Sequence, residues 1–409
     1  MTDLDLNFVR AQFPAFGQSS LEGWAFFENA GGSYACRQTI ERLTRFYTET
    51  KVQPYAPYPA ATQAGREMDD AHHRLAGIMN VGDDEVVIGP STSQNTYTLA
   101  SAFRAGWDDG DEIVVTNQDH EANTGAWRRL ADRGITVREW SVDPTTGMLD
   151  PADLASLLNE RTRLVAFPHC SNIVAHINPV REVCDMVRAA GAVSVVDGVS
   201  AAPHGLPDID ALGADIYLFS AYKTYGPHQG VMTVRRAVND ALANQSHWFN
   251  EHSVRKRLVP AGPDHAQVAA CQGMVDYIDL LHEHHFDDGA PAAERGRRVH
   301  DLMRAHEISL VAPLLEYLDG RDDVRIMGPT DPTIRVPTVA FVPNGIAPAA
   351  AAAKLADHRV MAGAGDFYAV RLIEAMGQPA DEGVVRLSFV HYTSPAEISQ
   401  AIAALEAVL

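Results

Sequence analysis

Two segments of the 409-residue chain pair a buried strand with a side chain that could do chemistry. In SAYKTYGPHQG, residues 220–230, Lys223 directly follows the apolar run GADIYLF, so a lysine stands where a buried strand ends. A lysine in a desolvated pocket has a lowered pKa and becomes a nucleophile that can form a Schiff base. The alternative is a lysine that extends to the surface. In VVDGVSAAPHG, Asp197 also ends an apolar strand, where a buried carboxylate needs a cation or several donors to stay ionised, unless it only caps the following turn.

A third segment could bind an anion. In IGPSTSQNTYTL, Ser91, Thr92 and Ser93 stand between a strand and a helix. Free backbone N–H groups and the helix dipole favour an anion there, although an ordinary helix N-cap has the same pattern. An anion clamp, a strand-end acid and a strand-end lysine, in this order, are what pyridoxal 5'-phosphate needs.

The elements that must position these side chains alternate along the chain. Apolar runs typical of buried strands occupy residues 85–89, 111–116, 134–141, 162–169, 192–198, 215–220 and 230–236. Residues 93–106, 124–134 and 178–191 have helical spacing, and each ends in a glycine that suits a left-handed helix cap. This alternation predicts an α/β domain with a mainly parallel seven-stranded sheet, in which ligands gather at the carboxyl ends of the strands.

The pattern changes after about residue 290. A long helical stretch leads to the apolar runs VRIMGP, TVAFVP and VVRLSFVHY, with an alanine-rich helix near 348–357 and a last helix from 394. We expect an N-terminal segment (1–20) that packs on a small domain, a large cofactor-binding α/β domain (21–285) and a small C-terminal α+β domain (286–409). The stretch 245–290 shows no clear pattern and is expected to join the two domains.

Composition and charge narrow the class of protein. Apolar residues make up 46% and charged residues 21% of the chain, as in ordinary globular proteins. The formal net charge of -20 argues against nucleic acid or an anionic membrane as a partner. Four cysteines without CxxC spacing indicate neither a zinc site nor a disulfide framework, and no secretory signal or membrane span is found. We expect a cytoplasmic protein without a metal, and interpret HEHH (282–285) as a solvated helix end.

Between FFENAGG (26–32) and RLSFVHYTSPAEI (386–398), nearly the whole chain resembles the class V aminotransferases, which are fold-type I pyridoxal phosphate enzymes. The resemblance is strongest to their cysteine desulfurase-like branch. It implies that Lys223 is the Schiff-base lysine, that Asp197 pairs with the pyridine nitrogen and that His120 stacks on the cofactor ring. It also implies a homodimer with the active site near the subunit interface.

The same resemblance assigns the remaining contacts. Arg386 would pair with the α-carboxylate of an amino-acid substrate, a task that suits its bidentate guanidinium. Further cofactor contacts fall on Thr92, Ser93, Asn172, Ser200, Ser220 and Tyr222, and further substrate contacts on Asn29, Asn172 and Tyr368. Tyr55, Tyr58, Phe367 and Tyr368 are candidates for contact with the substrate side chain.

The chain departs from the family pattern at several positions, among them Tyr222, where the family often has a histidine. In AGAGDFYAVRL (362–372), Tyr368 stands where a desulfurase carries the mobile cysteine that accepts sulfur, and no cysteine follows Cys271. Ser200 replaces a glutamine near the cofactor, and Gly363 falls where desulfurases have a second arginine. Pro263 replaces a threonine that many relatives offer to the partner subunit's phosphate.

Without that thiol, the resemblance predicts β-elimination from a sulfur- or selenium-bearing amino acid. Lys223 would remove the α-proton while Asp197 keeps the ring nitrogen protonated, and the products would be a thiol, ammonia and a 2-oxo acid. The alternatives are an aminotransferase, an epimerase or a decarboxylating pyridoxal phosphate enzyme of small-molecule biosynthesis. In another class, the chain would be a non-catalytic regulatory or binding protein.

Overall fold

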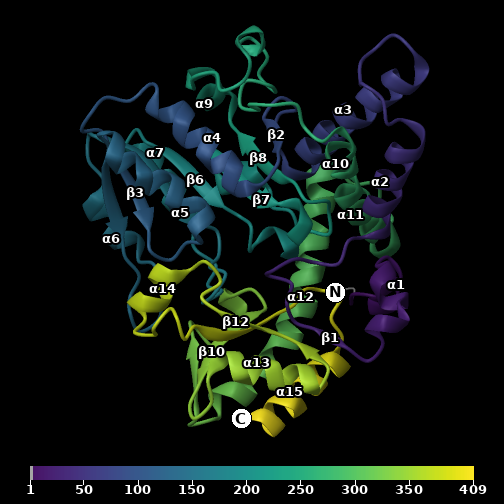
Figure 1. Cartoon of the computed structure of the whole chain (residues 1–409), viewed down its shortest axis with the longest axis vertical. Helices are drawn as coiled ribbons and strands as arrows, with labels where there is room; N and C mark the ends of the chain where they lie inside the picture. Colours follow the sequence, from purple (N-terminus) through teal and green to yellow (C-terminus); the bar gives the residue numbers. More distant parts are fainter. Residues whose placement is uncertain (1–2) are drawn as a thin grey trace.

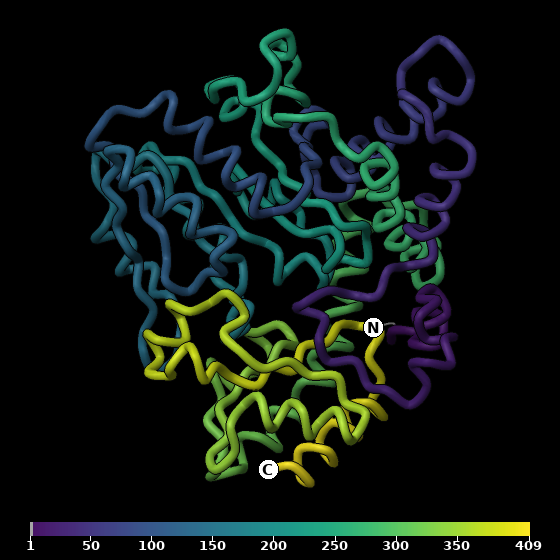
Figure 2. Tube along the Cα trace, in the orientation of Figure 1, coloured from purple at the N-terminus to yellow at the C-terminus, as the bar shows by residue number. Residues whose placement is uncertain are grey.

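The computed structural model describes residues 3–409. A large sheet and its helices form the upper part of the molecule in Figure 1, and a smaller sheet with its helices forms the lower part. The long helix α12 (Ala292–Asp319) runs from one part to the other. Both termini lie in the lower half of the view, so the chain starts beside the part in which it ends (Figure 2).

The large sheet has seven strands, as the apolar runs predict. Its order is β2 (Val86–Gly89), β8 (Gly230–Val234), β7 (Ile216–Ser220), β6 (Val193–Asp197), β5 (Thr162–Pro168), β3 (Glu112–Thr116) and β4 (Thr136–Trp140). The five strands from β7 to β4 are parallel, whereas β8 runs antiparallel to both of its neighbours. The carboxyl ends of β3, β5, β6 and β7 therefore lie at one edge of the sheet.

Helices bury both faces of this sheet. Alternate strand residues such as Val195 and Leu218 pack with α4 (Thr92–Arg104) and α5 (Glu121–Arg128) in one core. Their neighbours in sequence, such as Val196 and Phe219, join a second core with α3 (Pro59–Met79), α7 (Val180–Ala189), α10 (His265–Ala270) and α11 (Gln272–His285). Successive strand residues face opposite sides, which is why strands covered on both faces read as continuous apolar runs.

Local differences from the sequence patterns have simple causes. The helix expected over 124–134 ends at Arg128, and a 3-10 turn (Arg129–Arg133) continues it. Gly134 and Gly191 have the predicted left-handed conformation, with φ of 86° and 75°. Gly106 does not, because the Ala105 and Gly106 N–H groups close the end of α4 in a right-handed turn. The unassigned stretch 245–290 contains α10 and α11, which pack against α2 (Arg37–Glu49) and α3.

The smaller sheet is antiparallel and carries the C-terminal part of the chain. Its order is β12 (Gly363–Gly365), β13 (Val384–Ser388), β10 (Thr338–Pro343) and β9 (Val324–Met327). α12, α13 (Pro348–Asp357) and α15 (Pro395–Val408) share its apolar core. β1 (Ala25–Phe26) pairs with β11 (Val360–Met361), and this pairing brings residues near 28 alongside β13. The remaining helices are α1 (Leu6–Ala11), α6 (Pro151–Leu157), α8 (Ile209–Leu212), α9 (Arg236–Ala241) and α14 (Val370–Ala375).

The end of α11 corrects one expectation. His282 is 2% exposed, and the His284 ring stacks on Phe8 with ring centroids 3.7 Å apart. His285 Nε2 accepts a hydrogen bond from the Asp5 N–H at 2.9 Å. The prediction of a solvated helix end holds for Glu283 and His284, which are exposed, and is wrong for His282, which is buried. Within residues 3–409, no helix combines the length and hydropathy that crossing a bilayer requires.

Candidate active site

A cavity of about 220 Å³ opens at the carboxyl ends of the parallel strands. Its lining residues are Ser91, Thr92, Ser93, Asp119, His120, Ala122, Cys170, Asn172, Asp197, Val199, Ser200, Ser220, Tyr222, Lys223 and His228. All nine cofactor-contacting positions expected from the sequence are among them. The fold thus brings together side chains from the ends of four strands and from the start of α4.

One wall of the cavity offers hydroxyl and backbone donors. Ser91 caps α4, its Oγ accepting a hydrogen bond from the Gln94 N–H at 3.2 Å. Thr92 Oγ1 lies 2.8 Å from Ser220 Oγ at the end of β7. At Gly230 a Cβ would lie 2.3 Å from the Ser91 carbonyl carbon, so this loop can lie against β8 only because residue 230 has no side chain. Such a helix start suits a phosphate group.

Lys223 projects from a 3-10 turn directly after β7 and is 9% exposed. Burial, and secondly the charge of Arg386, lower its pKa from 10.5 to about 8, against the opposing effects of Asp197 and Glu28. Its Nζ makes no hydrogen bond or ion pair with any residue from 3 to 409. The amine is therefore buried, and a much larger fraction of it is neutral at physiological pH than in an ordinary lysine.

Asp197 ends β6 and is 4% exposed. Burial raises its pKa from 3.8 to about 6, while a hydrogen bond from the Val199 N–H and the nearby Lys223 act in the opposite direction. Its side chain has no other hydrogen bond in the described part of the chain. A buried carboxylate that accepts only one hydrogen bond lacks the donors it needs to stay ionised. The N–H of a protonated pyridine would supply a second donor.

A second buried carboxyl group, Asp119, supports His120. Burial and the neighbouring Asp197 raise the pKa of Asp119 well above its usual range, which favours its uncharged form. Asp119 accepts hydrogen bonds from the His120 N–H at 2.8 Å and from Asn123 Nδ2 at 2.6 Å. His120 Nδ1 in turn accepts from the Ala122 N–H at 3.0 Å. Burial lowers the pKa of His120 to about 3, so a neutral imidazole ring lines the cavity.

The fit to pyridoxal phosphate is therefore good in charge and in donor type. Hydroxyls and N–H groups suit its phosphate, the Asp197 carboxylate suits its ring nitrogen, and the Lys223 amine suits its aldehyde. The Tyr222 ring stacks on His228 with centroids 4.8 Å apart, which adds an aromatic pair to the same cavity.

Sequence reasoning did not select Asp119, Cys170 or His228. Asp119 precedes His120 and Cys170 follows β5, so both stand just beyond the ends of predicted strands. His228 lies in the Lys223 segment itself. A search of every strand end for polar side chains would have included the first two.

Arg386 lies on β13 beside this cavity and is 3% exposed. Its Nη2 is 2.7 Å from Glu28 Oε1, and its Nη1 donates to the Asn172 carbonyl at 3.3 Å. The Phe367 ring covers the guanidinium, with 3.7 Å between Cζ and the ring centroid. Glu28 was not selected from the sequence, although it precedes Asn29.

The other predicted substrate contacts differ in their surroundings. Asn29 Nδ2 donates to the Ser388 carbonyl at 3.3 Å and Asn29 Oδ1 accepts from the Tyr392 hydroxyl, so both ends of this amide are engaged. Its contact with a substrate stays a prediction. Tyr368 is 69% exposed, with its ring centroid 5.3 Å from that of His120. Tyr55 lines a different cavity, of about 540 Å³.

The loop that carries Tyr368 is held against the large sheet. The Glu121 N–H donates to the Tyr368 carbonyl at 2.9 Å, and Asn172 Nδ2 donates to the Phe367 carbonyl at 3.0 Å. In Figure 2 this yellow-green segment lies beneath the blue segment that contains β3 and α5. Phe367 and Tyr368 have φ of 49° and 58°, a conformation that is unusual for residues with large side chains.

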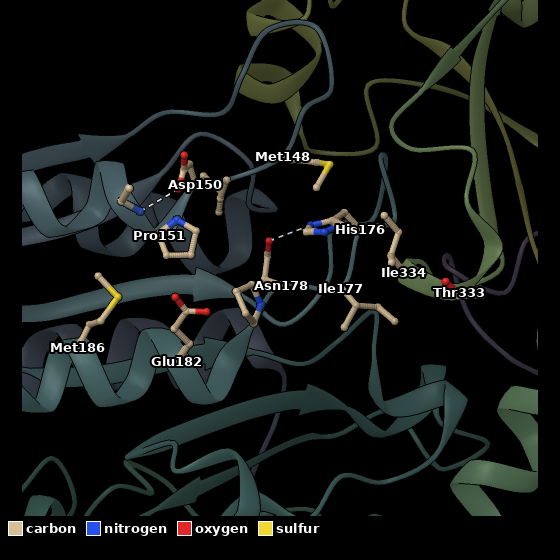
Figure 3. Close-up of a pocket in the computed structure, with 13 residues that line it drawn as sticks. Met148, Asp150, Pro151, His176, Ile177, Asn178, Glu182, Met186, Thr333 and Ile334 are labelled. Atoms are coloured by element: carbon tan, nitrogen blue, oxygen red, sulfur yellow. Dashed lines mark hydrogen bonds between the residues drawn. The ribbon is translucent and has the colours of Figure 1, made fainter.

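A larger cavity lies elsewhere, between the start of α7 and residues 333–334. Its volume is about 770 Å³, and Figure 3 shows His176 and Glu182 among its lining side chains. His176 Nδ1 is 3.2 Å from Asn178 Oδ1. None of the site residues predicted from the sequence lines this cavity. The candidate site is therefore identified by its position at the strand ends and by its side chains, and not by the volume of its cavity.

Comparisons with known proteins agree with this fold. The aminotransferase class-V profile matches residues 25–262 and 298–401. An aminotransferase-like protein of Gibberella zeae is 36% identical, over 98% of both chains. A cysteine desulfurase-like protein of Aspergillus flavus is 30% identical, over 97% of this chain and 88% of its own. A nonribosomal peptide synthetase-like enzyme of Aspergillus fumigatus is 34% identical over 98% of this chain, which spans 26% of that longer protein.

Solved structures confirm the fold. A cysteine desulfurase of Thermococcus onnurineus superposes with a TM-score of 0.85 at 22% identity, over 100% of this chain and 99% of its own. The fold is that of the fold-type I pyridoxal phosphate enzymes. The chain belongs to the aminotransferase class-V family, whose members depend on pyridoxal phosphate.

Proposed function

We propose that this protein is a pyridoxal 5'-phosphate-dependent enzyme that eliminates a sulfur- or selenium-bearing group from the β-carbon of an amino acid. The observation that carries the proposal is the buried, unpaired Lys223 amine in one cavity with Asp197. The names of the relatives support the choice of an amino-acid substrate, and one of them is called cysteine desulfurase-like.

Each cofactor-holding role falls on a residue that lines the cavity. Thr92, Ser93 and Ser220 would hold the phosphate, and His120 would present its neutral ring to the face of the pyridine. Asp197, ionised beside a cationic N–H, would keep the ring nitrogen protonated. Bound in this way, the cofactor supplies an electron sink for the bond that breaks at the α-carbon.

Proton transfer would rest on Lys223. Its pKa of about 8 lets the amine accept the α-proton near neutral pH and return a proton afterwards. Hydrogen bonds from Asn172 and Glu121 hold the loop that contains Phe367 and Tyr368 beside this cavity. In each turnover the α-proton would pass to Lys223, and the sulfur would leave the β-carbon with the electrons of the carbon–sulfur bond and take up a proton as a thiol. One water would then hydrolyse the carbon–nitrogen bond and release ammonia and a 2-oxo acid.

A desulfurase needs a reactive cysteine to accept sulfur, and none of the four cysteines of this chain suits that role. All four cysteines are buried. Cys170 lines the cavity, but burial raises the pKa of its thiol far above the usual value, and Asp197 adds to this effect. A protonated thiol is a poor nucleophile. Elimination needs only the lysine and the cofactor.

The experiment is a panel of S-substituted cysteines incubated with the cofactor-loaded protein, with the 2-oxo acid and ammonia measured over time. We expect steady release of both products, and none from Lys223→Ala. Amino transfer to a 2-oxo acid without elimination would make the protein an aminotransferase, and epimerised or decarboxylated substrate would identify those alternatives. Protein that takes up no cofactor would contradict the proposal altogether.

We also propose a homodimer. Trp248 and Phe249 are 84% and 66% exposed, and Tyr55 is 58% exposed. Aromatic side chains so exposed on one chain are typical of surfaces that a partner covers. Light scattering after size exclusion should give twice the mass of the chain, 44.4 kDa, and a monomer at micromolar concentration would contradict this.

A further inference from the structure

Glu28 forms an ion pair with Arg386, whose guanidinium would bind the substrate carboxylate in the proposed function. The two residues are 358 positions apart, and the fold brings Glu28 Oε1 to 2.7 Å from Arg386 Nη2. We propose that Glu28 is a specificity-determining residue: it pairs with Arg386 in the empty site, and a substrate carboxylate must displace it. The protein then prefers an amino acid only weakly over an amine that lacks the carboxylate. This inference rests on the proposed function.

The surroundings of Arg386 leave a ligand one route. Phe367 covers the face of the guanidinium, and Nη1 donates a hydrogen bond to the Asn172 carbonyl. The Arg386 side chain is 3% exposed, whereas that of Glu28 is 29% exposed. Glu28 is thus the partner that can rotate toward solvent, so an incoming carboxylate reaches the guanidinium where Glu28 now sits.

The existing pair is incomplete, which makes the exchange feasible. Arg386 Nε and Glu28 Oε2 are both buried without a hydrogen-bond partner in the described residues. Glu28 therefore uses one donor of the guanidinium, whereas a carboxylate bound side-on would use Nη2 and Nε together. A ligand can gain a second charge-assisted hydrogen bond that Glu28 does not make, and Glu28 regains water when it leaves.

The main chain makes room for this arrangement at Gly363. A Cβ there would lie 2.1 Å from Glu28 Oε2 and 2.9 Å from Phe367 Cε1. Any other residue would force the Glu28 carboxylate or the Phe367 ring to move. The absence of a side chain at residue 363 thus leaves room for the contact between Glu28 and Arg386.

The test compares two ligands that differ only in the carboxylate. 2-Aminoisobutyrate and tert-butylamine share a skeleton and have no α-hydrogen, so their binding to the cofactor-loaded protein is read by calorimetry without turnover. In Glu28→Gln the guanidinium loses its competing carboxylate and keeps a side chain of similar volume. We expect the preference for 2-aminoisobutyrate over tert-butylamine to rise about tenfold or more relative to the unaltered protein.

Two further variants make the result decisive. Glu28→Asp keeps the charge but shortens the side chain, and should raise the preference in the same direction if Glu28→Gln does not fold. Glu22→Gln, at an exposed position nearby in sequence, should leave it unchanged. A preference that stays constant or falls in Glu28→Gln overturns the inference, because Glu28 would then be inert or would position Arg386 for the substrate. If neither ligand binds any of these proteins, the proposed function itself is contradicted.

Discussion

Thr92 Oγ1 and Ser220 Oγ lie 2.8 Å apart, although 128 residues separate them in the chain. One hydroxyl stands at the start of α4 and the other at the end of β7, and both line the candidate active site. The contact exists because β2 and β7 both flank β8, so their following segments meet at one edge of the sheet. The hydroxyls of two separate segments thus form one continuous surface in the cavity.

Removal of one hydroxyl from this surface should weaken cofactor binding. Thr92→Val keeps the shape of the side chain and removes its donor, so we expect the Kd for pyridoxal phosphate to rise about tenfold, as for one hydrogen bond to a charged group. Equilibrium dialysis measures this. Thr145→Val, at an exposed turn, is the matched control. Equal affinities in the two variants would show that the Thr92 hydroxyl does not contact the phosphate.

The rate of covalent cofactor attachment should depend on pH with an apparent pKa of about 8. The neutral amine attacks the aldehyde, so the rate should rise as pH increases through 8 and level off above it, well below the ordinary lysine value of 10.5. Because the folded pKa is the lower one, Lys223 also contributes stability that is complete above pH 10.5 and is lost as pH falls through 8.

Stopped-flow absorbance at a series of pH values measures the attachment rate. Asp197→Asn should move the curve to lower pH, because the Asp197 charge raises the pKa of Lys223. Lys354→Ala, on the exposed side of α13, should leave the curve unchanged. A midpoint near 10.5 in the unaltered protein would mean that Lys223 is solvated.

The two buried aspartates should respond differently to the same substitution. Asp197→Asn removes the charge that keeps the ring nitrogen protonated, and we expect kcat to fall by about 100-fold or more. The raised pKa of Asp119 favours its uncharged form, so Asp119→Asn changes the charge of the site less, and it leaves an oxygen to accept the His120 N–H. We expect a much smaller loss of kcat. Steady-state kinetics measures both variants, and equal losses would contradict the distinct roles.

The cysteine in the cavity should be dispensable. Cys170→Ala removes a thiol whose raised pKa makes it a poor sulfur acceptor. We expect elimination to continue at a similar rate, with some loss of stability from the smaller side chain. Cyanolysis of protein-bound sulfur during turnover supplies the second measurement. Loss of activity together with loss of cyanolysable sulfur would restore a desulfurase mechanism.

Much of the fold could be predicted because its signals are local. A strand buried on both faces needs an uninterrupted apolar run, and each of the seven runs forms a strand. The end of the helix at Arg128 could not be predicted in this way, because residues 129–133 keep helical spacing while a 3-10 turn changes only the hydrogen bonds. Likewise α10 and α11 were hidden in the stretch 245–290, whose polar residues obscure their buried faces.

The sequence by itself determined which side chains stand at strand ends, and therefore placed Lys223, Asp197 and Thr92 in one candidate site. Their order sufficed because the carboxyl ends of parallel strands share one edge. Only the tertiary structure decided the charges and partners around them. The raised pKa of Asp119 depends on burial beside another carboxylate, and the pairing of Glu28 with Arg386 depends on two segments that meet from opposite ends of the chain. Burial and long-range contact are properties of the packed molecule, and no local pattern encodes them.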